Sequence, residues 1–350
     1  MLAVTPRRSG PRILIVRLSA LGDAIHGLPV ACALRAAIPR VVVGWVVEGR
    51  TGDLLEGHPA IDHVVRTPRG WLKSPRAVLD LRRRLRELQF DIAIDLQCLT
   101  KSAIAARLSG ARRRMGMAGD DGREFSRWLH NDLVEVQGEH VVDRYLTMLR
   151  PLGIKTPAVQ FDLPETPADA KAANRFLAAE GLTAGRFAIL NPGAGWPSKI
   201  WPAERYGEVA RRLAAEHGLP SVAVWGGAAE QPLGEAIVAA SGGAARLAPP
   251  TTVNELAALC RRSALFLGSD TGPMHLAVAV GTPTVSLHGT SQAERCGAYG
   301  PNNIRLQVRY HAGSSRQRRR ADNSAMREIS AELAYAACRQ LLARAQRRVG

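Results

Sequence analysis

The 350-residue chain has few cysteines, and their arrangement gives them no structural role. The five are odd in number and scattered, and they include no Cys-x-x-Cys pair: Cys32, Cys98, Cys260, Cys296 and Cys338. A disulfide framework or a zinc site needs paired or clustered cysteines, so the sequence favours neither. We expect free thiols.

Long apolar runs are also missing. No uninterrupted run in the sequence approaches the roughly 20 residues that a membrane-spanning helix needs. Residues 1–11 contain Arg7 and Arg8 but lack the apolar stretch of a signal peptide. These two absences predict a cytoplasmic protein.

Several well-known motifs do not occur. Neither Gly-x-Gly-x-x-Gly nor Gly-x-x-x-x-Gly-Lys-[Ser/Thr] is present, which argues against a dehydrogenase and a P-loop nucleotidase. The sequence also lacks Asp-x-Asp, His-Glu-x-x-His and any other ligand cluster of matching spacing. We therefore expect no metal site and no cofactor.

Positive charge, in contrast, is abundant, with a formal net charge of +16. Residues 1–160 contain 25 Lys/Arg against 16 Asp/Glu, residues 161–304 contain 11 against 12, and residues 305–350 contain 11 against 3. The excess lies at the two ends of the chain. Such charge steers anionic ligands, so a nucleic acid, an acidic lipid or an acidic sugar is a candidate partner. A generally basic protein without such a partner fits the net charge equally well.

Short apolar runs alternate with helix-like segments. The runs lie at 13–18, 41–47, 90–96, 187–193, 221–227, 265–272 and 282–289. The helical patterns lie at 23–37, 74–89, 99–108, 203–217, 229–240 and 252–262. This alternation predicts parallel sheets covered by helices on both faces, an α/β fold.

The proline-rich segment 152–170 lacks helical periodicity and is the predicted linker between two domains. We expect an N-terminal domain over 1–160 and a C-terminal domain over 161–328. The amphipathic helix within 329–350 could pack back on the N-terminal domain. The basic stretch 309–320 has no aromatic residues to stack bases, which favours a mobile solvated loop over a nucleic-acid patch.

The segment GSDTGPMHL (268–276) follows an apolar run and opens a helix. Free N–H groups and the helix dipole at such a point favour an anion such as a diphosphate. Gly272 would let a phosphate approach closely, while Thr271 and His275 could face the same ligand. Capping of the helix by Asp270 or Thr271 is the alternative, but it leaves His275 unexplained.

Two further strand ends carry charged candidates. Lys199 follows the Gly193-Ala194-Gly195 turn, and a lysine is suited to a phosphate, although many such lysines are only surface residues. Glu230 could accept hydrogen bonds from a ribose, or could simply stand at a helix N-terminus.

In the first domain, Asp23 follows the turn after the first apolar run. Its carboxylate could act as a general base toward an acceptor hydroxyl, or could cap the following helix. His26, one turn later, is more typical of a packing residue.

Three segments, in their order and spacing, resemble the heptosyltransferases of glycosyltransferase family 9, and most closely the lipopolysaccharide heptosyltransferase I type. They are ILIVRLSALGDAIHGLP (13–29), NPGAGWPSKIWP (191–202) and GSDTGPMHLAVAVGTPTVSLHG (268–289). Similar segments at 44–48, 90–117 and 140–146 extend the resemblance over nearly the whole chain.

The resemblance implies a GT-B fold, with two Rossmann-like parallel-sheet domains facing each other across a cleft. It implies an inverting, metal-independent enzyme whose C-terminal domain binds ADP-heptose and whose N-terminal domain binds an anionic, lipid-linked, Kdo-bearing lipid A acceptor. A peripheral contact with the inner membrane face would follow from such an acceptor.

The same resemblance assigns roles residue by residue. The catalytic base falls on Asp23. The donor-binding residues fall on Lys199, Glu230, Asp270, Thr271, Gly272 and His275. The acceptor-binding residues fall on Arg17, Arg69, Lys73, Arg76 and Arg123. The chain departs from the nearest type at Ala194 and Gly195, where that type has threonines, and in 289–301, which lacks the usual Pro-Thr-Asp-Pro.

Other interpretations remain open at this point. A family 9 transferase could use another nucleotide-sugar or a more distal saccharide. A basic nucleic-acid-binding protein is supported by charge alone, and an oxidoreductase with two Rossmann-like halves is disfavoured by the missing glycine motif.

Overall fold

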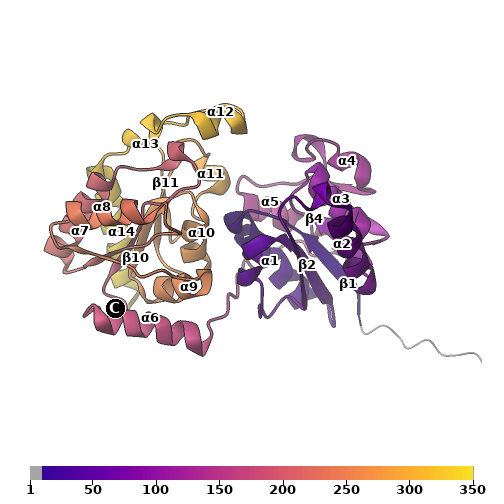
Figure 1. Cartoon of the computed structure of the whole chain (residues 1–350), viewed down its shortest axis with the longest axis horizontal. Coiled ribbons are helices and arrows are strands. Elements are labelled where there is room, and N and C mark those ends of the chain that lie inside the picture. Colours follow the sequence, from indigo (N-terminus) through magenta and orange to yellow (C-terminus); the bar gives the residue numbers. More distant parts are fainter. Residues whose placement is uncertain (1–9, 350) are drawn as a thin grey trace, which may run out of the picture. The chain divides into compact units, whose positions relative to one another are not determined.

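The computed structural model describes residues 10–349. The chain divides into two compact units, residues 1–164 and 165–350, each with its own parallel sheet (Figure 1). The division falls inside the proline-rich segment 152–170.

The sheet of the first unit has the strand order β3-β2-β1-β4-β5-β6. Its strands are β1 (Arg12–Val16), β2 (Val42–Glu48), β3 (His63–Thr67), β4 (Ile92–Asp95), β5 (Arg113–Met117) and β6 (Asp132–Val134). Its helices are α1 (Leu21–Ala37), α2 (Pro75–Glu87), α3 (Thr100–Leu108), α4 (Ser126–Leu129) and α5 (Val141–Thr147). Helix α1 packs with α5, and α2 packs with α3.

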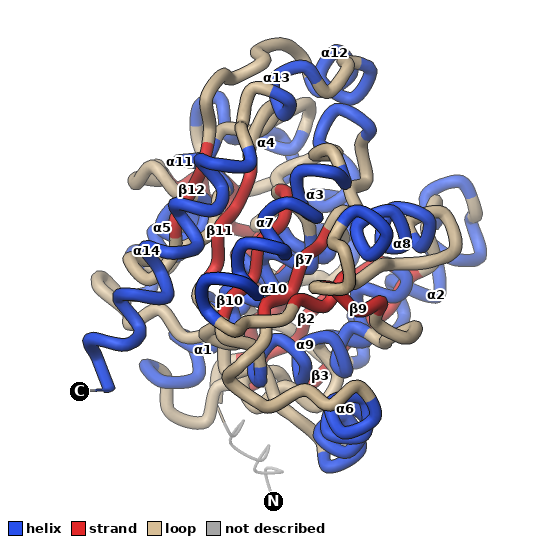
Figure 2. Tube along the Cα trace, turned by 90° about the vertical axis from the view of Figure 1, so that its left-hand side faces the viewer, coloured by secondary structure: helices blue, strands red, loops and turns tan. Residues whose placement is uncertain are grey.

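The second sheet has the order β12-β11-β10-β7-β8-β9. Its strands are β7 (Ala188–Asn191), β8 (Ser221–Ala223), β9 (Ala245–Leu247), β10 (Leu265–Ser269), β11 (Thr284–Leu287) and β12 (Ile304–Leu306). Its helices are α6 (Pro167–Ala179), α7 (Ala203–His217), α8 (Gln231–Ala240), α9 (Val253–Arg262), α10 (Gly272–Ala279), α11 (Ala293–Cys296), α12 (Ser315–Arg320), α13 (Ser324–Arg327) and α14 (Ala331–Val349). Figure 2 shows the strands in red and the helices that pack around them in blue.

Both sheets have the Rossmann order, in which the first strand of the unit lies between the second and the fourth. All strand pairs are parallel, so the carboxyl ends of the strands in one sheet meet at one edge. Ligands in such sheets bind where the strand order reverses. That point lies between β1 and β4 in the first unit and between β7 and β10 in the second. The predicted α/β fold class is confirmed.

The central strands form because their apolar side chains are buried on both faces. Ile13, Leu14, Ile15 and Val16 of β1 are fully buried, as are the side chains of β7. Helices start at sequence-encoded caps: Thr252 accepts the N–H of Glu255 at the start of α9, and the Glu255 carboxylate accepts the N–H of Thr252.

The strands that the sequence did not reveal are mainly the outermost ones. Strands β3, β6, β9 and β12 form the four sheet edges, and β5 neighbours β6. An edge strand is covered less completely and lacks the continuous apolar run of a central strand. Strand β12, for example, has only partly buried side chains.

The C-terminal helix α14 packs on the core of the second unit. It contacts α7, β10, β11 and β12. Its apolar residues Tyr335, Cys338 and Leu341 belong to the core of that unit because they line the buried side of the helix.

The basic stretch expected to be a loop contains a helix, α12, over Ser315–Arg320. The Ser314 hydroxyl caps it by accepting the N–H of Gln317. A single arginine-rich turn has no apolar period, so the sequence pattern gave no helix signal. None of the helices within residues 10–349 has the length and apolarity to span a membrane.

Candidate functional site

The polar segment after β10 lies at the order-reversal point of the second sheet. Asp270 follows the buried end of β10 and is itself almost completely buried. Lys199, at the end of a short 3-10 turn after β7, points to it from the neighbouring strand end: its Nζ lies 2.6 Å from Asp270 Oδ2. His275 Nε2 lies 3.1 Å from the other carboxylate oxygen, Oδ1. Asp270 therefore holds two nitrogen-bearing side chains at one strand end.

The electrostatics of this cluster favour the charged carboxylate. Burial would raise the pKa of Asp270, but the positive charge of Lys199 and the hydrogen bond with His275 hold it well below its ordinary value. His288 directly follows the last residue of β11 and is fully buried, and this burial lowers its pKa to about 4. The neutral ring of His288 lies 2.9 Å from Ser286 Oγ.

The start of α10 has no side-chain cap. Thr271 occupies the N-cap position, yet its hydroxyl accepts from Asn191 Nδ2 at 3.1 Å and donates to the Ser269 carbonyl at 3.2 Å. The alternative in which Asp270 or Thr271 caps the helix is therefore not what the structure has. The second residue of the helix, Pro273, has no N–H, so Gly272 offers the N–H at this start to another acceptor.

Glu230 lies beside the glycine turn after β7. Its Oε2 accepts the N–H of Gly226 at 2.8 Å, and burial raises the pKa of the carboxyl. A Cβ at Gly193 would collide with this carboxylate, which explains the glycine there. Glu230 is also the N-cap residue of α8, without a side-chain cap bond.

The arginine-rich helix α12 docks against the turn that carries Lys199. Ser198 Oγ donates to the Arg318 carbonyl at 2.7 Å, and Arg318 Nη1 donates to the Thr290 carbonyl at 2.9 Å. Two cations lie over the Trp196 ring: Lys199 Nζ is 4.7 Å and Arg319 Cζ is 5.0 Å from the ring centroid. The proximity of these arginines to Lys199 could not be predicted from the sequence, because the docking joins segments about 120 residues apart.

In the first unit, Asp23 lies at the carboxyl end of β1, in the first turn of α1. Its Oδ2 accepts the N–H of Ala20 at 3.1 Å and forms an ion pair with Arg17 Nη2 at 2.6 Å. Burial would lower the pKa of Arg17, but the Asp23 charge raises it above its ordinary value. Asp23 Oδ1 has no partner among the described residues, and the side chain is 42% exposed. One oxygen is fixed and the other is available.

The loop after β4 supports this arrangement. Gln97 Oε1 accepts the N–H of Leu18 at 2.9 Å, and the Leu96 carbonyl accepts from Arg17 Nη1 at 3.3 Å. The Gln97 carbonyl accepts from Arg123 Nη2 at 3.1 Å. Residues 96–97 thus hold two of the predicted acceptor-binding arginines, Arg17 and Arg123.

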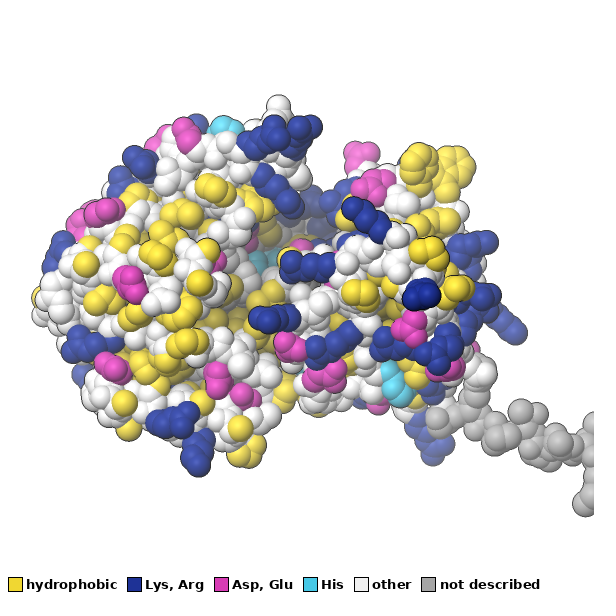
Figure 3. Space-filling model, in the orientation of Figure 1, with side chains coloured by type: hydrophobic (Ala, Val, Ile, Leu, Met, Phe, Trp, Pro, Cys, Tyr) yellow, Lys and Arg dark blue, Asp and Glu magenta, His cyan; other side chains and the backbone are white. Residues whose placement is uncertain are grey.

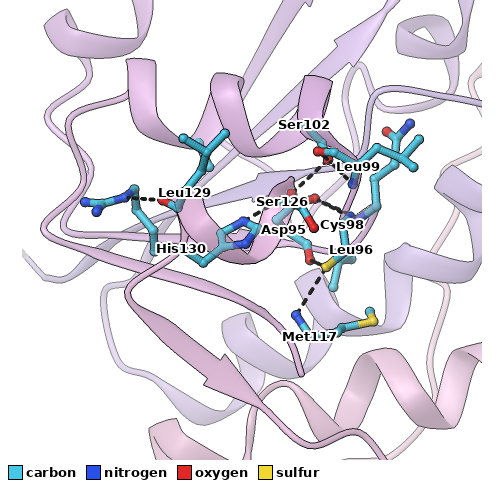
Figure 4. Close-up of polar contacts among 12 residues, drawn as sticks. Asp95, Leu96, Cys98, Leu99, Ser102, Met117, Ser126, Leu129 and His130 are labelled. Carbon is cyan, nitrogen blue, oxygen red and sulfur yellow. Dashed lines mark hydrogen bonds and ion pairs between the residues drawn. The ribbon is translucent and has the colours of Figure 1, made fainter. Parts of the chain in front are cut away.

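The loop is in turn fixed by Asp95, the fully buried last residue of β4 (Figure 4). Asp95 Oδ1 accepts the N–H groups of Gln97 and Cys98, both at 2.9 Å. Its Oδ2 accepts from Ser102 Oγ at 2.8 Å and lies 3.2 Å from His130 Nε2. The carboxylate thus accepts backbone N–H groups that follow the end of β4 and can no longer pair with a neighbouring strand.

Asp95, Gln97 and His130 were not among the candidates predicted from the sequence. A signal existed for two of them, because Asp95 lies near the end of the apolar run 90–96, which contains the neighbour of β1, and Gln97 directly follows that run. His26 is buried with its ring centroid 5.5 Å from that of His140, as expected of a packing residue.

Three other predicted acceptor residues follow β3 at the same edge of the first sheet. Arg69, Lys73 and Arg76 are exposed, and the described residues give none of them a carboxylate partner. Within residues 10–349 no group of three His, Cys, Asp or Glu side chains could hold a metal ion.

Comparison with known proteins identifies the family. The sequence profile of glycosyltransferase family 9 (heptosyltransferase) matches residues 78–325. A lipopolysaccharide heptosyltransferase 1 of Pseudomonas aeruginosa is 31% identical over 304 residues, covering 84% of this chain and 83% of the relative.

Solved structures share the fold. The family 9 glycosyltransferase of Veillonella parvula superposes with a TM-score of 0.83 at 24% identity, covering 95% of this chain and 98% of the other. The E. coli heptosyltransferase WaaC, solved with ADP-2-deoxy-2-fluoro heptose, gives 0.73 at 22% identity and coverages of 94% and 99%. The fold is GT-B, and the chain belongs to glycosyltransferase family 9, the heptosyltransferases.

Proposed function

We propose that this enzyme transfers heptose from ADP-heptose to a Kdo-bearing lipid A acceptor in the synthesis of the lipopolysaccharide inner core. The similarity to a lipopolysaccharide heptosyltransferase 1 supports the pathway, and the ligand of the E. coli structure supports the donor. The observation that carries the proposal is the buried Lys199–Asp270–His275 cluster beside the uncapped start of α10.

The cluster is suited to a diphosphate leaving group. The Gly272 N–H at the start of α10 and the helix dipole favour negative charge, and Thr271 stands directly before this glycine. Lys199 and His275 add donors, while Asp270 fixes both side chains. Glu230, beside the Gly193 turn, would accept hydrogen bonds from the ribose. In this proposal protein groups, not a metal ion, stabilise the departing ADP.

Asp23 would act as the general base. Its Oδ1, which has no partner in the part of the chain that the structure describes, takes the proton of the acceptor hydroxyl while the hydroxyl oxygen forms a bond to the anomeric carbon of heptose. The bond from that carbon to the diphosphate oxygen breaks, and ADP leaves with the electron pair. A single displacement inverts the configuration. Arg17 keeps the carboxylate in place through Oδ2.

The anionic acceptor gives a role to the excess positive charge of residues 1–160. Arg69, Lys73 and Arg76, which are exposed and have no carboxylate partner among residues 10–349, would bind acidic sugar or phosphate groups, together with Arg123. We assign acceptor binding to residues 1–160 and donor binding to residues 161–328. A cytoplasmic enzyme that meets the inner membrane face would reach such a lipid-linked acceptor.

A second candidate within the family is a transferase with another nucleotide-sugar or a more distal saccharide acceptor. It is favoured by Ala194 and Gly195, which lack the threonine hydroxyls of the heptosyltransferase I type beside the candidate donor site. Mass spectrometry of the transfer product separates the two candidates.

Calorimetric titration with ADP, UDP and GDP, with and without a chelator, tests the donor site. We expect binding selective for ADP, unaffected by the chelator, and lost in His275→Ala but not in the exposed control Lys171→Ala. A preference for UDP or GDP would change the donor, and the absence of any nucleotide binding would contradict the proposed site.

A further inference from the structure

Two large aromatic side chains of the first unit are exposed. Phe125 and Trp128 are 70% and 79% exposed, the highest values among the large hydrophobic residues that the structure exposes. They stand three positions apart at helix α4, so they share one face. Figure 3 shows hydrophobic side chains gathered over α4, at the upper right. We name residues 123–129 the α4 corner.

The backbone of the α4 corner is well fixed. Ser126 is fully buried, and its hydroxyl donates to the Arg123 carbonyl at 2.7 Å. The Phe125 N–H donates to Thr100 Oγ1 at 3.3 Å, and the Leu129 carbonyl accepts from Arg114 Nε at 3.1 Å. The outward position of the two aromatic residues is therefore set by an ordered backbone.

Arginines lie near the aromatic pair. Arg127 lies between them in sequence, is exposed and has no carboxylate partner among the described residues. Arg114 contacts the corner, and Arg107 lies on α3, which packs against α4. The one carboxylate of the corner, Glu124, already accepts the Thr100 N–H at 2.9 Å.

We propose that the α4 corner docks this enzyme on the surface of an anionic lipid bilayer. Exposed aromatic residues beside arginines are typical of segments that insert at the level of lipid headgroups, where the aromatic body is apolar and the cations meet acidic lipids. A second copy of the chain is a poorer partner. The two side chains, at 70% and 79% exposure, offer on the order of 300 Å², whereas a stable dimer buries about 800 Å² per partner.

The inference extends the proposed function, in which the acceptor is lipid-linked, but its test needs neither donor nor acceptor. In a co-sedimentation assay, vesicles of phosphatidylglycerol and phosphatidylethanolamine should bind the wild-type protein. The bound fraction should fall as the salt concentration rises. Phe125→Ser/Trp128→Ser should lower the bound fraction by about tenfold or more. The matched control Val308→Ser/Leu333→Ser removes two exposed apolar side chains of the second unit and should bind as wild type does.

Charge is tested in the same way. Arg127→Glu should weaken binding to anionic vesicles, whereas Arg175→Glu, an equal change of net charge on exposed α6, should not. Equal loss in both would show that only net charge matters and would overturn a specific docking surface.

A spectroscopic readout does not depend on the loss of binding. Brominated acyl chains should quench tryptophan fluorescence in wild type, and Trp128→Phe, which keeps an aromatic side chain, should bind vesicles but lose most of the quenching. Unchanged quenching would place the contact elsewhere. A Phe125→Ser/Trp128→Ser protein that binds vesicles normally but changes its sedimentation coefficient from that of wild type would indicate a dimer surface and contradict the proposal.

The transfer reaction separates this inference from the proposed function. With a delipidated acceptor in solution, the Phe125→Ser/Trp128→Ser protein should match wild type, whereas with a vesicle-embedded acceptor it should be slower. Absence of transfer by wild type would refute the proposed function and leave the vesicle result standing.

Discussion

Removing Lys199 should destabilise the second unit because Asp270 would remain as a buried charge without its cation. In the ion pair the Lys199 side chain is 15% exposed and that of Asp270 is 9% exposed, with 2.6 Å between Nζ and Oδ2. Breaking a buried pair by removing one partner typically costs about 3–5 kcal/mol. For a unit of this size such a loss lowers Tm on the order of 10 °C.

The perturbation is Lys199→Met, which keeps the length of the side chain and removes the charge. The double variant Lys199→Met/Asp270→Asn should recover most of the stability, because no unpaired charge is then buried. It should not recover ADP binding, since the proposed diphosphate contact is still missing. Lys171→Met, an exposed lysine of the same unit, is the control and should change stability by less than about 0.5 kcal/mol.

Scanning calorimetry and ADP titration of the four proteins, wild type included, measure both effects. A Lys199→Met protein with the Tm of wild type would show that the buried Asp270 carboxylate does not depend on this cation. Recovery of ADP binding in the double variant would refute the role of Lys199 toward the diphosphate.

Three further predictions concern the supporting residues. Gln97→Ala removes the acceptor of the Leu18 N–H, so kcat should fall about tenfold with the KM for donor unchanged, as steady-state kinetics would show. The pKa of buried His288 is lowered to about 4, so the unfolded chain binds the proton first as pH falls, and the second unit should lose about 3 kcal/mol between pH 6.5 and 4. Denaturation of His288→Asn should lack this pH dependence. Arg319→Gln should weaken ADP binding about threefold in calorimetry, because it removes a cation beside Trp196, and no change would separate α12 from the donor site.

The central strands were accessible from the sequence because burial on both faces requires a continuous apolar run. The apolar run at 13–18 corresponds to β1. The run at 265–272 contains β10, which ends directly before Asp270. The edge strands carry no such run, and β3 (His63–Thr67) and β12 (Ile304–Leu306) were therefore missed.

Candidate site residues at strand ends could be named from the sequence, but their pairing could not. Lys199 and Asp270 are 71 positions apart, and only the β7–β10 neighbourhood brings them together. The position of Asp95 at a strand end could be predicted, but its contacts could not, because partners such as Ser102 and His130 come from other parts of the chain. Helix α12 was missed since its stability comes from the Ser314 cap and from docking, not from a periodic pattern.

Single-turnover heptose transfer by Asp23→Asn tests the central claim most directly. If Asp23 is the general base, the rate should fall about 10²–10⁴-fold, the usual contribution of such a base, and ADP affinity should not change because the proposed donor residues lie in the other unit. Asp80→Asn, an exposed aspartate of α2 in the same unit, serves as the control and should retain the wild-type rate. Transfer by Asp23→Asn within about tenfold of wild type would contradict the assignment of Asp23 as the base.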